Sequence, residues 1–111
     1  MAANEFTDDE FAILDLVSED AYVFCELRFV VDAPSILLAF LEKGLVEIEE
    51  CESDGTERLL VLDRARAAIT DAASWADSPD PPVSPIRWYQ AFVTPAGWDA
   101  YDRAALERHP G

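Results

Sequence analysis

The sequence predicts an α+β domain, with helices at both ends and a small antiparallel sheet between them. One junction predicts this class most directly: Leu37–Ile48 ends an apolar-faced helix at Gly44 and continues as a strand in which apolar and acidic residues alternate. A second junction has Thr94 and Pro95 after an aromatic strand, and these are the residue types preferred at a helix start. With 111 residues, half of them hydrophobic, the chain is long enough for one domain with its own core.

The first helix has a well-defined start. Thr7 is a suitable N-cap, and Glu10, three residues later, completes a capping box. Phe6 and Phe11 occupy the positions of a hydrophobic staple. The residues that follow supply a buried face with helical spacing: Ile13, Leu14, Leu16 and Val17. We expect this helix to break at residues 18–20.

Two further short helices are expected before the sheet. Ala21–Phe29 predicts the second helix, and the β-branched pair Val30 and Val31 leaves its end open. Asp32 is the expected N-cap of the third helix, with Pro34 in its first turn, where proline loses no hydrogen bond. Three short helices with tight turns, followed by a strand, match the helix-turn-helix plan.

The centre of the chain predicts a hairpin followed by a helix and a loop. Leu45–Cys51 alternates as a strand, Ser53–Thr56 contains an Asp-Gly turn signal, and Glu57–Leu62 is apolar enough to return as a partner strand. Asp63–Ala76 has helical spacing. Asp77–Pro85 contains four prolines and is expected to form an irregular loop.

The C-terminal part predicts another strand and a long helix. Ile86–Val93 contains three aromatic residues and is typical of a strand. Thr94 as N-cap and Pro95 at the first helical position begin a helix that runs to about Arg108. One face of this helix, at i, i+3 and i+7 spacing, has Trp98, Tyr101 and Ala105.

Charge is concentrated in the first half of the chain. Residues 1–57 contain 16 acidic residues against two basic ones, whereas residues 58–111 contain seven against six. A field of this sign repels free DNA, because protein–DNA affinity comes largely from lysine and arginine at phosphates. The acidic N-terminus lacks the pattern of a signal peptide, and no apolar run approaches membrane-spanning length, so we expect a cytoplasmic protein with no membrane partner.

No set of residues predicts catalysis, a cofactor or a metal site, so the protein is not expected to be an enzyme. The only histidine, His109, lies near the end of the chain, where segments often fray. Cys25 and Cys51 lack the CxxC spacing of zinc sites. The acidic run Glu47–Asp54 lacks the spacing of a calcium loop. We interpret it as a solvated strand face that discourages edge-to-edge pairing.

The larger aromatic residues have two interpretations. They fill the core of a small domain, which we favour, or they line a ligand pocket or a dimer surface. The residues concerned are Trp75, Trp88, Tyr89, Trp98 and Tyr101.

Two segments resemble winged-helix bacterial regulators of the multiple-antibiotic-resistance and phenolic-acid types: Leu37–Ile48, and Tyr89–Tyr101 with its Thr-Pro-Ala-Gly helix start. The resemblance implies a winged helix-turn-helix fold over residues 1–111, with three N-terminal helices, a small antiparallel wing sheet and a C-terminal helix. Residues 52–85 then form a long insertion in or after the wing. In a competing alignment, residues 53–55 are the wing tip and residues 77–111 an appendage. We prefer the three-stranded sheet, which includes both 57–62 and 86–93.

The resemblance also implies where DNA would be read, and the residues there differ from the family pattern. The outward residues of the recognition helix would be Ser35, Leu38, Ala39 and Glu42. None is basic, and leucine and alanine cannot hydrogen-bond base edges. The arginines that could contact phosphates are Arg58, Arg64, Arg66 and Arg87.

These observations lead to three functional hypotheses. The first is a small non-enzymatic winged-helix regulatory protein, associated with transcription and acting mainly through protein–protein contacts. The second is a DNA-binding transcriptional regulator that works as a homodimer, and the third is an acidic DNA mimic or inhibitor. We expect self-association through the C-terminal helix, around Trp98, Tyr101 and Ala105, because surplus aromatic surface tends to become interface.

Overall fold

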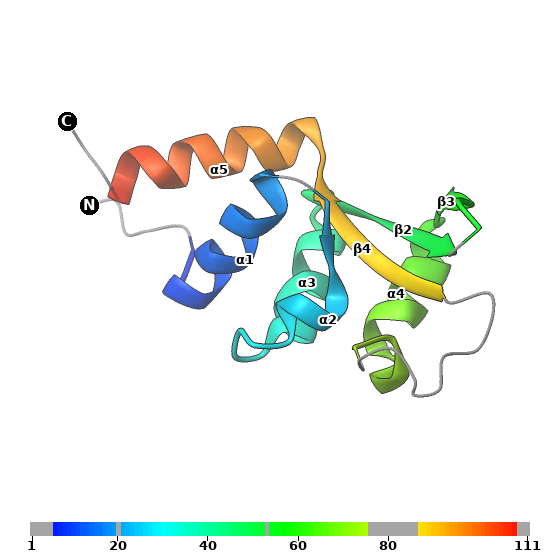
Figure 1. Cartoon of the computed structure of the whole chain (residues 1–111). Coiled ribbons are helices and arrows are strands. Elements are labelled where there is room, and N and C mark those ends of the chain that lie inside the picture. Colours follow the sequence, from blue (N-terminus) through cyan, green and yellow to red (C-terminus); the bar gives the residue numbers. More distant parts are fainter. Residues whose placement is uncertain (1–5, 20, 53, 76–86, 109–111) are drawn as a thin grey trace.

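An antiparallel four-stranded sheet, with helices packed on one of its faces, organises the computed structural model (Figure 1). Residues 6–19, 21–52, 54–75 and 87–108 are described. Their elements are α1 (Asp8–Glu19), β1 (Tyr22–Val23), α2 (Phe24–Leu27), α3 (Ala33–Glu42), β2 (Val46–Glu52), β3 (Glu57–Leu59), α4 (Leu62–Thr70), the 3-10 helix η1 (Ala72–Trp75), β4 (Arg87–Val93) and α5 (Pro95–Arg108). The predicted α+β class is confirmed. The loop expected at 77–85 lies outside the described residues.

The strand order is β1-β4-β2-β3, and every neighbouring pair is antiparallel. The sheet therefore contains residues from both 57–62 and 86–93, as the preferred prediction required. β2 and β4 pair along their whole length, from Val46 opposite Val93 to Glu52 opposite Arg87. β3 pairs with the second half of β2, and α4 begins three residues after β3 ends.

The helix expected at Ala21–Phe29 is wrong in its first part. Tyr22 and Val23 form β1 and pair with Ala91 and Gln90 of β4, so only Phe24–Leu27 is helical. Tyrosine and valine favour strands, and the sheet offers them a partner almost 70 residues further along the chain, which a local pattern does not reveal.

The N-termini of α1 and α3 differ in whether a side chain caps the helix. Thr7 and Glu10 form the predicted capping box, with Glu10 N–H donating to Thr7 Oγ1 at 3.1 Å and Thr7 N–H donating to Glu10 Oε1 at 2.7 Å. Asp32 stands at the N-cap of α3 but makes no side-chain capping bond, because its backbone is left-handed with φ 59°. The predicted N-cap position of Asp32 is therefore confirmed, but the side-chain bond expected of an N-cap is not formed.

α3 ends just before Gly44, as the sequence predicts. This glycine has φ 77°, its N–H donates to Leu41 C=O at 3.1 Å, and Leu45 N–H donates to Phe40 C=O at 2.9 Å. These two bonds form a Schellman motif, which glycine permits because it has no Cβ to clash in the left-handed region.

The start of α5 docks directly onto this helix–strand junction. Thr94 Oγ1 accepts the Gly97 N–H at 3.0 Å, as expected of an N-cap, and also donates to Gly44 C=O at 2.6 Å. A Cβ at Gly97 would overlap the carbonyl oxygen of Leu45. The two sequence segments that carry the family resemblance therefore pack against each other.

The core lies between the sheet and the helices. Its buried residues come from all five α-helices and the sheet, and the largest fully buried side chains include Ile13, Leu14, Phe24, Leu27, Leu37, Phe40, Ile48 and Ile69. Trp75 is buried too: its ring stacks on Phe24, and its indole N–H donates to Ile69 C=O at 2.8 Å. α5 begins just after β4, runs away from the sheet and packs against α1 (Figure 1).

Candidate protein-interaction surface

The register of the sheet separates two faces with different compositions. Side chains alternate along a strand, so the residues on the same side as Val46 and Ile48 point toward the helices, which we call the inner face. The opposite side, which we call the outer sheet face, consists of Val23 on β1, Glu47, Glu49 and Cys51 on β2, Glu57 and Leu59 on β3, and Trp88, Gln90 and Phe92 on β4.

The apolar side chains of the outer sheet face do not join the main core. The core cluster includes inner-face residues such as Val46, Ile48 and Ala91 and, among the residues that the structure describes, none from the outer sheet face. Leu59 is 56% exposed and Trp88 is 37% exposed. Large apolar side chains that contribute little to the core of a domain are typical of interaction surfaces.

Carboxylates surround these apolar groups. Glu47, Glu49 and Glu57 lie on the outer sheet face, and none of the described side chains on that face is cationic. Burial and the neighbouring Glu49 and Glu57 raise the pKa of the Cys51 thiol, so this cysteine stays protonated at neutral pH. Gln90 donates to Glu49 at 2.7 Å, which fixes one carboxylate in place.

A groove adjoins the outer sheet face at the point where β3 ends. Its volume is about 260 Å³, and its lining residues are Leu41, Gly44, Val46, Glu47, Leu59, Leu60, Leu62 and Thr94. We call it the leucine groove. It shares Glu47 and Leu59 with the outer sheet face, so the two features form one continuous surface of apolar side chains and carboxylates.

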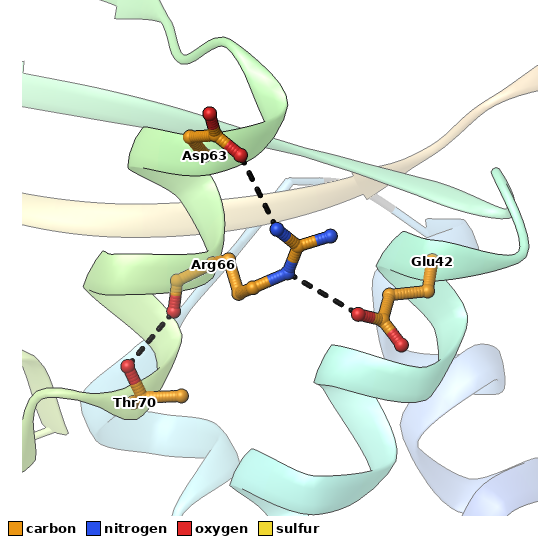
Figure 2. Close-up of polar contacts among 4 residues, drawn as sticks. All are labelled: Glu42, Asp63, Arg66 and Thr70. Atoms are coloured by element: carbon orange, nitrogen blue, oxygen red, sulfur yellow. Dashed lines mark hydrogen bonds and ion pairs between the residues drawn. The ribbon is translucent and has the colours of Figure 1, made fainter.

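The expected recognition helix, α3, does not present a free outer face. Ser35 is exposed, but Leu38 and Ala39 are half-buried, because α4 packs along α3. Glu42 binds Arg66 of α4, with 3.2 Å between Glu42 Oε1 and Arg66 Nε (Figure 2). α4 thus covers part of the face that was predicted, from the winged-helix resemblance, to contact DNA.

The predicted phosphate-contacting arginines whose side chains are described do not gather into one free cluster. Arg58 binds Glu50 at 3.1 Å, and Arg66 binds both Glu42 and Asp63 at 3.2 Å (Figure 2). Arg64 is exposed on α4, beside a cavity between this helix and the sheet. The side chain of Arg87 lies outside the described residues.

Glu50 is a buried carboxylate that the sequence interpretation missed. The solvated strand face expected at Glu47–Asp54 is wrong for Glu50 and Cys51, which are both buried. Glu50 continues the inner-face alternation of Val46 and Ile48, and this periodicity was the available signal. Arg58 binds its Oε1, and the Tyr89 hydroxyl donates to its Oε2 at 3.3 Å.

The cavity beside Glu50 has a volume of about 300 Å³, and its polar lining includes Asp63, Arg64, Asp71 and Tyr89. Both oxygens of Glu50 are engaged by the protein's own donors, so this carboxylate is suited to holding β2, β3 and β4 together. In the part of the chain that the structure covers, no group of three or more potential metal ligands is present. His109 lies outside the described residues.

The residues of the expected dimer face are divided between two environments. Trp98 is 46% exposed, whereas Tyr101 and Ala105 are half-buried. The Tyr101 hydroxyl donates to Asp15 of α1 at 2.6 Å, its ring stacks on Phe11, and the bond to Asp15 raises the pKa of Tyr101. Tyr101 therefore joins α5 to α1 within the chain.

No family model, curated protein or solved structure matches this chain. Among the helices of residues 6–19, 21–52, 54–75 and 87–108, none combines the length and the apolar character needed to cross a membrane.

Proposed function

We propose that this chain is a non-enzymatic, winged-helix-like regulatory protein that is associated with transcription and acts through protein–protein contacts. The observation that supports this proposal is the composition of the outer sheet face. Trp88, Phe92 and Leu59 stand apart from the core cluster beside carboxylates, on a face with no described cation. Such a surface suits a protein partner that brings both apolar and basic side chains.

DNA is a less suitable partner for the same surfaces. Nucleic-acid affinity depends on free arginine and lysine, and here Arg58 and Arg66 bind the protein's own carboxylates. The outward side of α3 offers base edges no basic group, and α4 lies against it. The function as a DNA-binding homodimer is therefore the less favoured alternative.

Site-specific cross-linking tests the proposal. A photo-reactive amino acid in place of Trp88 should capture a distinct protein in the native host, and the same amino acid in place of Leu106, which is also exposed but lies on α5, should not capture it. The same products from both positions, or sub-micromolar binding of duplex DNA at about 0.15 M salt, would contradict the proposal. A captured nucleic-acid-binding protein that DNA displaces would instead identify an acidic DNA mimic.

Self-association through α5 remains a separate prediction, favoured by the exposure of Trp98 and Leu106 on this helix. Two chains of charge −15 repel each other, and salt screens this repulsion, so a dimer should tighten between about 0.05 and 0.5 M salt. Sedimentation should show this shift, and Trp98→Ala should reduce it. A monomer at both salt concentrations, at tens of micromolar protein, would contradict the prediction.

A further inference from the structure

β3 is an edge strand, and two of its residues direct their backbone groups away from the sheet. Leu60 N–H donates to Ile48 C=O, and Glu52 N–H donates to Thr56 C=O, both at 2.9 Å. In an antiparallel ladder, hydrogen-bonded residues alternate with residues whose N–H and C=O point the other way. The backbone groups of Glu57 and Leu59 therefore point outward, two residues apart, in the geometry that an added strand requires.

Apolar side chains continue this edge beyond the end of β3. Leu59 is more than half exposed, Leu62 is 49% exposed, and both line the leucine groove with Leu41. Because β3 gives way to α4 after Leu59, a strand that follows the edge of β3 would extend past it, directly over the groove. The groove has room for one apolar side chain of that strand.

Charge along the edge is negative on the outer side of the sheet. Glu57 lies next to Leu59 on that side, and Glu47 lines the groove. Arg58, which lies between Glu57 and Leu59 in β3, points to the inner side and binds Glu50. A strand added here would thus meet a carboxylate and a leucine at successive positions of the same face.

We propose that the partner is an extended protein segment that adds to the edge of β3, antiparallel to it. Its side chains on the outer side are apolar over the leucine groove, apolar opposite Leu59 and basic opposite Glu57. This inference rests on the proposed function and specifies the kind of partner. Cross-strand apolar and opposite-charge pairs supply the specificity, and backbone bonds to Glu57 and Leu59 supply the alignment.

A second copy of this chain fits the edge less well. Pairing two β3 strands about a two-fold axis at Arg58 sets each Glu57 opposite a Leu59, which leaves a carboxylate against an apolar side chain on both sides. The like charge of the two chains adds repulsion. A basic segment removes both costs.

A synthetic peptide tests the inference directly. The probe has seven residues, with leucine at its first and third positions, lysine at its fifth and seventh, and threonine between them. A control peptide has the same composition, but its leucines and lysines fall on opposite sides of the strand. The probe should bind the full chain at least about tenfold more tightly than the control, and hydrogen exchange at the Glu57 and Leu59 amides should slow by about tenfold or more.

Variants of the edge complete the test. Leu62→Asp and Glu57→Lys should each weaken probe binding about tenfold, whereas Leu106→Asp, at a similarly exposed leucine on α5, should leave it unchanged. Circular dichroism of each variant checks that the fold is retained. Equal affinity for probe and control peptides, or binding without protection of the two amides, would overturn the inference.

The outcome separates this inference from the proposed function. If Leu62→Asp and Glu57→Lys leave the cross-link from position 88 intact, the partner occupies the outer sheet face without strand addition, and only the inference fails. If position 88 captures no protein, the proposed function fails regardless of how the peptide binds.

Discussion

The two faces of β2 differ in how deeply their side chains are buried and in what surrounds their carboxylates. On the inner face, Val46 and Ile48 are buried against the helices, and the buried carboxylate of Glu50 is held by Arg58 and Tyr89. On the outer face, Glu47 and Glu49 are half-buried and carry the charge, and the apolar groups around them lie apart from the core cluster. One seven-residue strand thus contributes to the core on one side and to the proposed interaction surface on the other.

The two faces of β2 are therefore expected to differ in how much they stabilise the fold. Burial of apolar area on the inner face stabilises the fold, whereas the apolar groups of the outer face contribute less because they remain partly in water. A carboxylate on the inner face needs partners, since an unpaired buried charge is costly. On the outer face, carboxylates remain available to a partner.

The largest expected effect is on the free energy of unfolding, when an aliphatic side chain on each face is shortened to alanine. Ile48→Ala should destabilise the protein by about 3 kcal/mol, because the fully buried side chain leaves a cavity. Leu59→Ala, on the neighbouring strand but largely exposed, should cost less than about 1 kcal/mol. Urea unfolding of both variants gives the two free energies. Similar losses would mean that the outer face also supports the fold.

The second prediction concerns the partners of Glu50. Arg58→Leu should destabilise the protein by about 2 kcal/mol, less than for a fully buried pair because the arginine is half exposed. Arg64→Leu is the matched control on α4, and its effect should lie within about 0.5 kcal/mol. The double variant Arg58→Leu with Glu50→Leu should recover most of the loss. Equal effects of the two arginine substitutions would contradict a special role for the Arg58–Glu50 pair.

The smallest expected effect is on the reactivity of Cys51, which depends on the negative charge of the outer sheet face. In a Cys25→Ser background, Cys51 should react with iodoacetamide at pH 8 about tenfold more slowly in the folded protein than in urea, because burial and the nearby glutamates raise its pKa. Glu49→Gln or Glu57→Gln should speed the folded-state reaction, since each removes a charge that opposes the thiolate. An unchanged rate in both variants would show that burial alone protects the thiol.

Local signals predicted the ends of several elements. The capping box at Thr7, the helix end at Gly44 and the start at Thr94 all depend on hydrogen bonds between residues five or fewer apart. Such bonds are determined by residue type and spacing, so they can be predicted from one sequence. The alternation in β2 likewise predicted a strand, and followed to its end it would have placed Glu50 on the buried side.

The composition of the candidate surface was only partly visible in advance. Alternation along Arg87–Val93 places Trp88 and Phe92 on the side opposite Ala91, but it does not state which side faces the helices. The face of α3 that was predicted to contact DNA is partly covered by α4. The two helices are joined by the Glu42–Arg66 pair, whose residues are 24 positions apart in the sequence. Which side of α3 faces outward could not be derived without knowing where α4 packs.

The sequence by itself determined the α+β class, the capped helix ends and the strands β2 and β4, because these depend on dihedral preferences and periodicity within a few residues. Only the tertiary structure decided that β1 joins β4, that Arg58 and Tyr89 hold Glu50, and that Leu59 and Leu62 meet Leu41 at one groove. These contacts join segments that are far apart in the chain. Their free energy depends on which surfaces the whole fold brings together, and no local pattern contains that information.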